Sequence, residues 1–406
     1  MEKIILKKII LDQRENFDKE KDIVERKIDK NIFNSNKIVV ITGIRRSGKS
    51  TLLKQISRNY ESFGYINFED DRLLNFTYDD FQRLYESFLE INPKTNTFFF
   101  DELQEIYAWE KFVSRLFDNN YKVFVTGSNA KLLSSEIATT LTGRNIKIEL
   151  FPFSFSEFLN FRKINIEYKT TKNKINIMKN LQDYINIGGF PEIIKSENFN
   201  ELKEIYQDIL IKDLIVRFKI RDQKEFRELA LFLLSNATKK ISYNNLKNIL
   251  GFTTTSKVKN FINFMNQAYL FFELFKYDTS VKKQIINDRK IYSIDTGLIK
   301  IAFHFSEDFG RLIENLVFLE LKRRNKDIYY FDNECDFIIR EGIKIVDAIQ
   351  VSYLLSQNKE REIEGLKKAI QKFKLKKGKI ITWDTEEKIT DEIEAIPLYK
   401  FLLENE

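Results

Sequence analysis

A short apolar run followed at once by a glycine-framed loop constrains this chain more than any other feature. Lys37 to Thr42 reads KIVVIT, and a short β-branched run of this kind is typical of a buried parallel strand. Residues 43–50 read GIRRSGKS, and residues 51–58 then read TLLKQISR, with apolar residues at helical spacing. The order strand, loop, helix predicts an α/β fold built on a parallel sheet.

The loop has the chemistry of an anion cradle. Its pattern is G-x-x-x-x-G-K-[ST], the phosphate-binding loop (P-loop), in which backbone N–H groups and a helix N-terminus face an anion. Lys49 is expected to reach the β- and γ-phosphates, and the Ser50 hydroxyl to ligate Mg²⁺. The alternative, a chance glycine turn before a helix, is disfavoured by the strand in front and the helix behind. The sequence therefore predicts ATP and Mg²⁺ as cofactors, bound by Gly43, Ile44, Arg45, Arg46, Ser47, Gly48, Lys49, Ser50 and Thr51.

A second apolar run ends in two carboxylates. Thr97 to Glu102 reads TFFFDE. In a P-loop ATPase, the first acid, here Asp101, holds Mg²⁺ through water, and the second, Glu102, polarises the attacking water. An ordinary strand before an acidic helix start is the alternative, but the complete P-loop upstream favours the catalytic interpretation.

Two further candidates follow a third predicted strand, Tyr121 to Thr126. Ser128 or Asn129 could sense the γ-phosphate and orient water, or could cap a following helix, and the sequence leaves both open. Arg144 precedes a fourth strand, 146–150. It is either an arginine finger for a neighbouring subunit's phosphate, a role that suits its permanent charge and forked donors, or a solvated surface residue.

Five motifs then occur in a recognisable order: GIRRSGKST, FFFDELQE, VTGSNAKLLSSE, LTGR with PFSFSEF, and GGFPE at 188–192. The chain resembles the archaeal and bacterial AAA+-type ATPases that carry a winged helix and a C-terminal degenerate PD-(D/E)xK nuclease-like domain. The resemblance implies ATP binding. It also implies that Asp101 and Glu102 are the Walker B pair, that Asn129 or Ser128 is sensor 1, and that Arg144 is a finger candidate.

The middle of the chain reads as helices and then as a winged helix. Residues about 155–235 fit a helical lid, in which Arg217 and Arg221 either contact phosphate or, as the pattern favours, pair with acids on a helix face. From about 236 to 278, two short helices and a strand place Lys257 to Gln267, opened by Ser256, in the recognition position. DNA binding and plain packing both remain open. Lysines that could meet phosphate are Lys239, Lys240, Lys247, Lys257 and Lys259.

The C-terminal order α-β-β-β-α-β resembles the PD-(D/E)xK nuclease fold. That chemistry needs acids to hold Mg²⁺ and a nearby lysine. Glu314 and Asp336 occupy acid positions, but the next motif reads Gln350-Val351-Ser352. Since glutamine binds Mg²⁺ weakly and serine supplies no ammonium, nuclease activity is not expected. A DNA nuclease regulated by the ATPase is kept as an alternative.

Composition sets outer limits. There are 67 Lys and Arg against 60 Asp and Glu, a net charge of +7, which is compatible with nucleic acid without arguing for it. One cysteine excludes an internal disulfide. No signal-peptide plan or membrane-length apolar run is present, so a cytoplasmic location without membrane contact is expected.

The predicted domains are 1–160 (P-loop AAA+ core), 161–235 (lid), 236–285 (winged helix) and 286–406 (nuclease-like). The predicted function is an ATPase that couples nucleotide state to domain rearrangement, with DNA and further copies of the chain as candidate partners. A switch with negligible turnover is the alternative.

Overall fold

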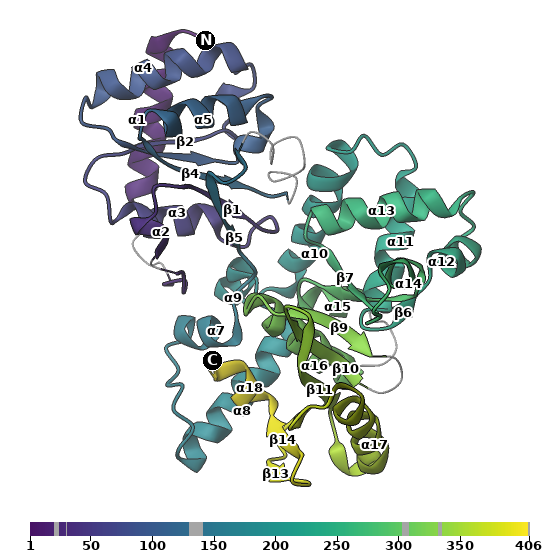
Figure 1. The fold of residues 1–406 in the computed structure, drawn as a ribbon. Coiled ribbons are helices and arrows are strands. Elements are labelled where there is room, and N and C mark those ends of the chain that lie inside the picture. The colour runs from purple at the N-terminus through teal and green to yellow at the C-terminus, as the bar shows by residue number, and fades with distance from the viewer. Residues whose placement is uncertain (20–23, 30, 130–140, 303–307, 332–334, 405–406) are drawn as a thin grey trace. The chain divides into compact units, whose positions relative to one another are not determined.

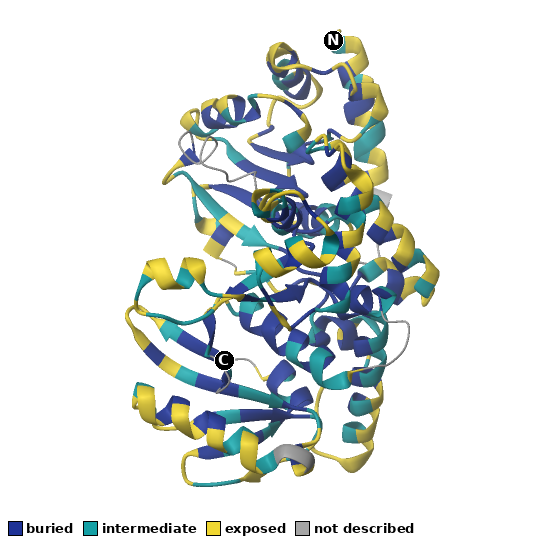
Figure 2. Ribbon diagram, turned by 90° about the vertical axis from the view of Figure 1, so that its right-hand side faces the viewer, coloured by how far each residue is buried: buried dark blue, intermediate teal, exposed yellow. Residues whose placement is uncertain are grey.

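The computed structural model describes residues 1–19, 24–29, 31–129, 141–302, 308–331 and 335–404. The chain divides into two compact units, residues 1–150 and 151–406. Figure 1 names the helices and strands of both. In Figure 2 the buried residues concentrate on the strands and on the inward faces of the helices. In the described part of the chain, no helix is both long and apolar enough to cross a membrane.

A parallel sheet forms the centre of the first unit, as the sequence predicts. Among the described residues it has five strands in the order β2-β3-β4-β1-β5, and all paired neighbours run parallel. Its strands are β1 (Ile38–Thr42), β2 (Gly64–Asn67), β3 (Thr97–Asp101), β4 (Lys122–Gly127) and β5 (Asn145–Glu149). Sequence analysis missed the edge strand β2.

Helices cover both faces of this sheet. Because side chains alternate along a strand, Ile38 and Val40 join one core cluster, and Val39 and Ile41 join the other. The first cluster includes residues of α1 (Lys3–Lys19), α4 (Phe81–Ile91) and α5 (Trp109–Asp118), and the second those of α3 (Lys49–Ser57) and α2 (Asn31–Asn34). Short 3₁₀ turns are η1 (Asp71–Leu73), η2 (Tyr78–Asp80) and η3 (Leu103–Glu105). The first unit is therefore a three-layer α/β fold.

The second unit begins with helices, as predicted for residues after 155. They are α7 (Phe155–Phe161), α8 (Thr171–Ile187), α9 (Pro191–Ser196), α10 (Phe199–Asp208), the π-helix η5 (Ile209–Val216) and α11 (Gln223–Ser235). Asp295 ties the connection between α8 and α9 to the start of a later helix, α15 (Thr296–Ala302). One of its carboxylate oxygens accepts from the Gly189 N–H at 2.6 Å and the other from the Gly297 N–H at 2.8 Å.

A small antiparallel sheet and two helices follow. The elements are β6 (Lys240–Ile241), α12 (Tyr243–Leu250), α13 (Thr255–Gln267), β7 (Phe271–Phe275), α14 (Val281–Ile286) and β8 (Arg289–Ser293), and the described strands pair in the order β6-β8-β7. Ser242 caps α12 and Gly251 ends it, as predicted. The cap of α13 is Thr254, whose hydroxyl accepts from the Lys257 N–H, so the prediction of Ser256 is wrong. The sheet runs past residue 285, because β8 pairs with both other strands.

A mixed sheet forms the C-terminal part. Its described strands lie in the order β13-β14-β12-β11-β10-β9; β9, β10 and β11 are antiparallel, whereas β11, β12 and β14 are parallel. The elements are α15 (Thr296–Ala302), α16 (Phe309–Arg323), β9 (Asp327–Phe331), β10 (Cys335–Glu341), β11 (Lys344–Ser352), α17 (Leu355–Phe373), β12 (Gly378–Thr382), β13 (Glu387–Lys388), β14 (Ile393–Pro397) and α18 (Leu398–Leu403). The order α16-β9-β10-β11-α17-β12 is the predicted one.

Candidate nucleotide site

The carboxyl ends of three neighbouring strands bring the predicted residues of the first unit together. Strands β3, β4 and β1 are adjacent and parallel, so the segments that follow them meet at one edge of the sheet. These segments are Asp101–Glu102 after β3, Ser128–Asn129 after β4, and the loop 43–48 after β1. Ser128 and Asn129 are buried, but residues 130–140, where a helix would test the capping alternative, lie outside the described residues.

The loop conformation requires glycine at both ends. A Cβ at Gly43 would lie 2.1 Å from the Leu150 carbonyl oxygen, which is a severe clash with backbone. Gly48 precedes α3 with a φ of 95°, in the left-handed region that favours glycine. Between them, Ile44 is buried and Arg46 also has a positive φ, of 63°. The chain therefore pays a local conformational cost to hold this turn against the start of a helix.

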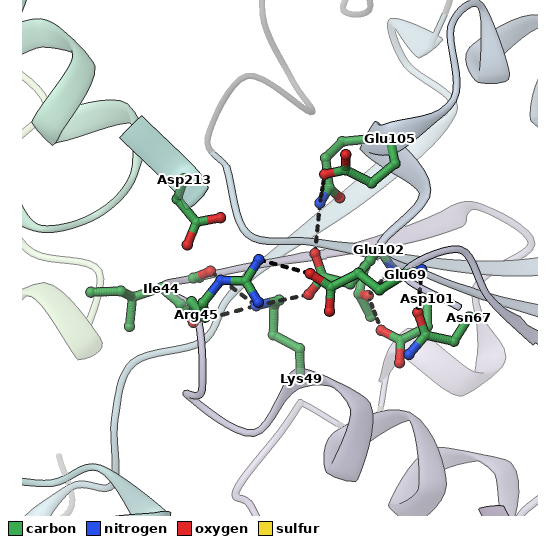
Figure 3. A network of polar contacts seen from close by, with 12 residues as sticks. Ile44, Arg45, Lys49, Asn67, Glu69, Asp101, Glu102, Glu105 and Asp213 are labelled. Atoms are coloured by element: carbon green, nitrogen blue, oxygen red, sulfur yellow. Dashed lines mark hydrogen bonds and ion pairs between the residues drawn. The ribbon is translucent and has the colours of Figure 1, made fainter. Parts of the chain in front are cut away.

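Lys49 lies buried between the loop and Glu102. Its Nζ donates to the carbonyl oxygens of Gly43 and Ile44, both at 3.3 Å, and is 3.2 Å from Glu102 Oε1. Figure 3 shows the lysine reaching from α3 towards this carboxylate. The ammonium therefore lies beside the glycine loop, at distances at or beyond the long end of hydrogen bonds.

Asp101 is enclosed by hydroxyl groups. Its side chain is fully buried; the Thr126 hydroxyl donates to Oδ1 and the Tyr65 hydroxyl to Oδ2 at 3.2 Å. Burial and the neighbouring charge of Glu102 raise the pKa of Asp101, against hydrogen bonds from Ser50 and Thr126 that lower it. The contact with Ser50 brings together the two side chains predicted to hold Mg²⁺.

Glu102 is held in a strained conformation. Its φ is 52°, in the left-handed region that costs a non-glycine residue free energy, and its backbone N–H donates to the Thr126 hydroxyl at 3.0 Å. Gln104 Nε2 donates to Oε2 at 2.6 Å. Burial alone would raise the pKa of Glu102, but the Lys49 charge, with further help from Gln104 and Arg45, lowers it. A charged carboxylate is therefore aimed at the lysine.

The residues present fit a nucleotide with Mg²⁺. The Ser47 hydroxyl is buried and has no hydrogen-bond partner among the described residues, so a polar ligand atom there would relieve its desolvation. The hydroxyl of Ser50 and the carboxylate of Asp101 are the hard oxygen donors that Mg²⁺ prefers. Thr51 lies in the first turn of α3, where helix N–H groups are unsatisfied by the helix itself.

Several contacts of this site were not predicted. Tyr65 and Thr126 bind Asp101, and Gln104 binds Glu102. Arg45, predicted to bind the nucleotide, forms an ion pair of 2.7 Å with Glu69, as Figure 3 shows. A signal existed for Thr126, which ends the strand YKVFVT, but none for Tyr65, because its strand was not recognised.

Arg144 lies at the other edge of the same sheet. It precedes β5, and its carbonyl oxygen accepts from the Ile38 N–H at the start of β1, whereas the P-loop follows the end of β1. Its guanidinium donates to the Ser114 hydroxyl at 2.6 Å and pairs with Asp118 at 3.0 Å. The structure therefore does not bring Arg144 to the P-loop of its own chain.

In the second unit, two of the predicted phosphate contacts are engaged elsewhere. Arg217 pairs with Asp213 at 3.7 Å, the helix-face pairing that the sequence favours. Lys257, in the predicted recognition helix, pairs with Asp222 at 2.6 Å and with Glu225 at 2.7 Å. Both pairs are intramolecular, so neither cation is presented to a phosphate without breaking an ion pair.

The two nuclease-like acids of the second unit share a lysine. Lys290 Nζ lies 2.8 Å from Glu314 Oε1 and 2.8 Å from Asp336 Oδ1, and the Tyr292 hydroxyl donates to Glu314 at 2.8 Å. Gln350 donates to Glu362 rather than standing free. In the described part of the chain, no group of three or more His, Cys, Asp or Glu side chains could hold a metal ion. The ammonium group of Lys290 therefore lies between the carboxylates of Glu314 and Asp336.

Comparison with known proteins identifies the class of the first unit. Residues 35–159 match the family model described as AAA domain (AAA_14), and residues 178–308 match a domain of unknown function (DUF8612). The first match covers the P-loop, the Asp101–Glu102 strand and the sheet that joins them. Residues 35–159 are therefore an AAA domain, of the nucleotide-binding P-loop ATPase type.

Two relatives define the family. The chain is 40% identical over 429 residues to "Uncharacterized protein MJ1544" of Methanocaldococcus jannaschii, with 99% of this chain and 96% of that one covered. It is 31% identical over 349 residues to an "Uncharacterized protein" of Haemophilus influenzae, with 79% and 84% covered. The chain belongs to the family of these two proteins.

Solved structures give a weaker likeness. The replication initiator DnaA bound to AMPPCP and single-stranded DNA has a TM-score of 0.26 at 12% identity, covering 57% of this chain and 82% of that one. Cdc6p from Pyrobaculum aerophilum has a TM-score of 0.26 at 12% identity, covering 65% and 87%. Scores this low support no conclusion about what this chain binds or does.

Proposed function

We propose that this chain binds ATP with Mg²⁺ and hydrolyses it, using the AAA domain of its first unit. The observation that carries the proposal is the buried group of Lys49, Asp101 and Glu102 at the carboxyl edge of the sheet, with Lys49 Nζ at 3.2 Å from Glu102. An ammonium, a hydroxyl-bound carboxylate and a second, charged carboxylate next to a glycine loop are the parts that phosphoryl transfer to water requires.

Each residue has a separate task in this proposal. The amides of the loop and of the start of α3 bind phosphate oxygens, and Lys49 neutralises their charge. Ser50 and Asp101 hold the metal ion, which supplies charge neutralisation at the phosphates when bound. Glu102 orients and deprotonates water. Because Lys49 holds the pKa of Glu102 down, pairing of that lysine with phosphate raises this pKa and makes Glu102 a stronger base.

Two variants test the proposal. Lys49→Ala should abolish binding of a fluorescent ATP analogue. Glu102→Gln should bind the analogue with nearly normal affinity but lose about 100-fold or more in turnover, the range for loss of a general base. Glu105→Gln is the matched control, because this exposed acid lies close by in sequence. Equal binding by wild type and Lys49→Ala would remove the site, and binding without turnover in the wild type would favour a nucleotide switch.

The second unit enters the proposal through its element order. We propose that α11 to β8 form a winged helix. Two observations support this: the described strands pair in the order β6-β8-β7, and α12 and α13 lie between β6 and β7 along the chain. We also propose that α16 to β12 form a nuclease-like scaffold that has lost cleavage, supported by the Lys290 contacts. In this proposal, the biological task of the chain is to rearrange its domains on DNA according to the bound nucleotide. Arg144 would act as a finger only towards a second copy of the chain.

A further inference from the structure

A buried arginine from the segment before the AAA core touches the phosphate-binding loop. Arg26 is 6% exposed, and its Nη1 donates to the carbonyl oxygen of Ser47 at 3.0 Å. A Cβ at Gly48 would lie 3.8 Å from the same nitrogen. The guanidinium therefore packs against the peptide that joins the last two residues of the loop before Lys49.

The backbone of Arg26 is fixed independently of its side chain. The Arg26 N–H donates to Gln55 Oε1 at 2.8 Å, and Gln55 Nε2 donates back to the Arg26 carbonyl oxygen at 3.0 Å. Gln55 belongs to α3, the helix that the loop opens. One helix thus presents the loop at its first turn and holds the arginine from a later turn, so the two are in a fixed spatial relation.

This arrangement has a consequence for phosphate binding. Burying a guanidinium is costly unless its donors are satisfied, and here one donor binds a loop carbonyl. Because the C=O and N–H of a trans peptide point in opposite directions, a Ser47 carbonyl turned towards Arg26 turns the Gly48 N–H the other way, where it can meet an anion. The permanent charge of arginine also adds to that of Lys49 at the cradle.

We propose that Arg26 is a positioning residue of the nucleotide site: it holds the Ser47–Gly48 peptide in the orientation that binds phosphate and contributes positive charge there. The inference rests on the proposed nucleotide binding. Since Arg26 acts on the part of the loop next to Gly48, it favours ADP and ATP alike and has no part in the chemical step.

The experiment measures the Kd of N-methylanthraniloyl-ADP and -ATP together with steady-state kcat and KM. Arg26→Met should weaken both nucleotides about ten- to a hundredfold, the effect of losing a charged hydrogen bond, and should leave kcat at saturating ATP within about twofold. Arg26→Lys keeps the charge without the fork and should recover part of the affinity. Arg58→Met, an exposed position just after the same helix, is the matched control and should bind as wild type.

The outcomes separate this inference from the function on which it rests. Tight binding by wild type, loss in Lys49→Ala and unchanged affinity in Arg26→Met would overturn the role of Arg26 alone. Failure of the wild type to bind either analogue would overturn the nucleotide site itself. If Arg26→Met does not fold, as judged by circular dichroism, the nucleotide affinities of Arg26→Lys and Gln55→Met test the role of Arg26 instead. Normal affinity in both would contradict the proposal, and a KM increase at constant kcat would support it.

Discussion

Two lysines of this chain, the buried Lys49 and the largely enclosed Lys290, contact acids in different ways. Lys49 has one carboxylate at 3.2 Å and two carbonyl oxygens at 3.3 Å, all at or beyond the long end of hydrogen-bond distances. Lys290 has two carboxylates, each at 2.8 Å. The first ammonium has the longer contacts and lies beside the glycine loop, whereas the second has two charged partners at 2.8 Å.

The pKa values of the acids beside the two lysines, Glu102 and Glu314, are shifted in opposite directions. The pKa of Glu102 is lowered, because Lys49 and other donors outweigh burial. The pKa of Glu314 is raised to about 7, because burial and the adjacent Asp336 outweigh Lys290. A lysine paired with a carboxylate in an enclosed site is thus not by itself a sign of catalysis. What distinguishes the first site is its place beside a glycine loop at a helix start, with a buried Ser47 hydroxyl that has no hydrogen-bond partner among the described residues and that a ligand can take up.

The largest expected difference between the two lysines is in stability. Lys290→Met removes the shared counter-charge of Glu314 and Asp336 and should lower the free energy of unfolding of the second unit by about 3–5 kcal/mol, the cost of breaking a buried ion pair. Urea denaturation followed by circular dichroism measures it. Binding of a fluorescent ATP analogue by the folded variant should stay unchanged.

A matched control is available in the sheet that carries Asp336. Lys379 pairs with Asp347 at 2.9 Å, but both side chains are partly exposed, so Lys379→Met should cost about 1 kcal/mol or less. Equal losses for the two variants would mean that the Lys290 pair is no more than an ordinary surface contact, and the contrast with Lys49 would fail.

A smaller effect is expected from pH. The folded-state pKa of Glu314, about 7, lies above its ordinary value of 4.5, so the protonated side chain stabilises the folded state at low pH. This contribution, about 1–3 kcal/mol, is lost as pH rises through about 7. Denaturation of wild type at pH 5.5 and pH 8 should therefore show more stability at the lower pH from this group, and Glu314→Gln should lack that part of the slope. A slope that is the same in both proteins would contradict the assignment.

The sequence predicted the parts of the nucleotide site that lie in contiguous motifs. Residues 43–51 and Asp101–Glu102 could be found because strand, loop and helix follow one another without interruption. Tyr65 and Arg26 could not, because their contacts with the site depend on which strands are neighbours and on where a segment without regular structure meets α3. Periodicity does not encode either.

The C-terminal part shows the limit of reading contiguous motifs. The order of its elements and the acids Glu314 and Asp336 were predicted, and the loss of the usual lysine was inferred from Gln350 and Ser352. What fills the acidic pair could not be read locally, since Lys290 comes from β8, which belongs to a different sheet. Sequence spacing shows which residue is missing from a motif but not which distant residue replaces it.

The smallest expected effect concerns the hydroxyl groups that bind Asp101. Among the described residues, Asp336 instead accepts from the Val351 N–H and from Lys290. Tyr65→Phe removes one donor to Oδ2 and leaves the Thr126 hydroxyl in place, so the loss should be about 1 kcal/mol, the net worth of one hydrogen bond. Because Asp101 is proposed to hold Mg²⁺, this loss should appear as a roughly fivefold higher Mg²⁺ concentration for half-maximal turnover, with little change in ATP affinity. Tyr60→Phe, whose hydroxyl is buried without a hydrogen-bond partner among the described residues, is the control. A shift of ATP affinity in Tyr65→Phe with unchanged Mg²⁺ dependence would place the tyrosine with the fold rather than with the metal.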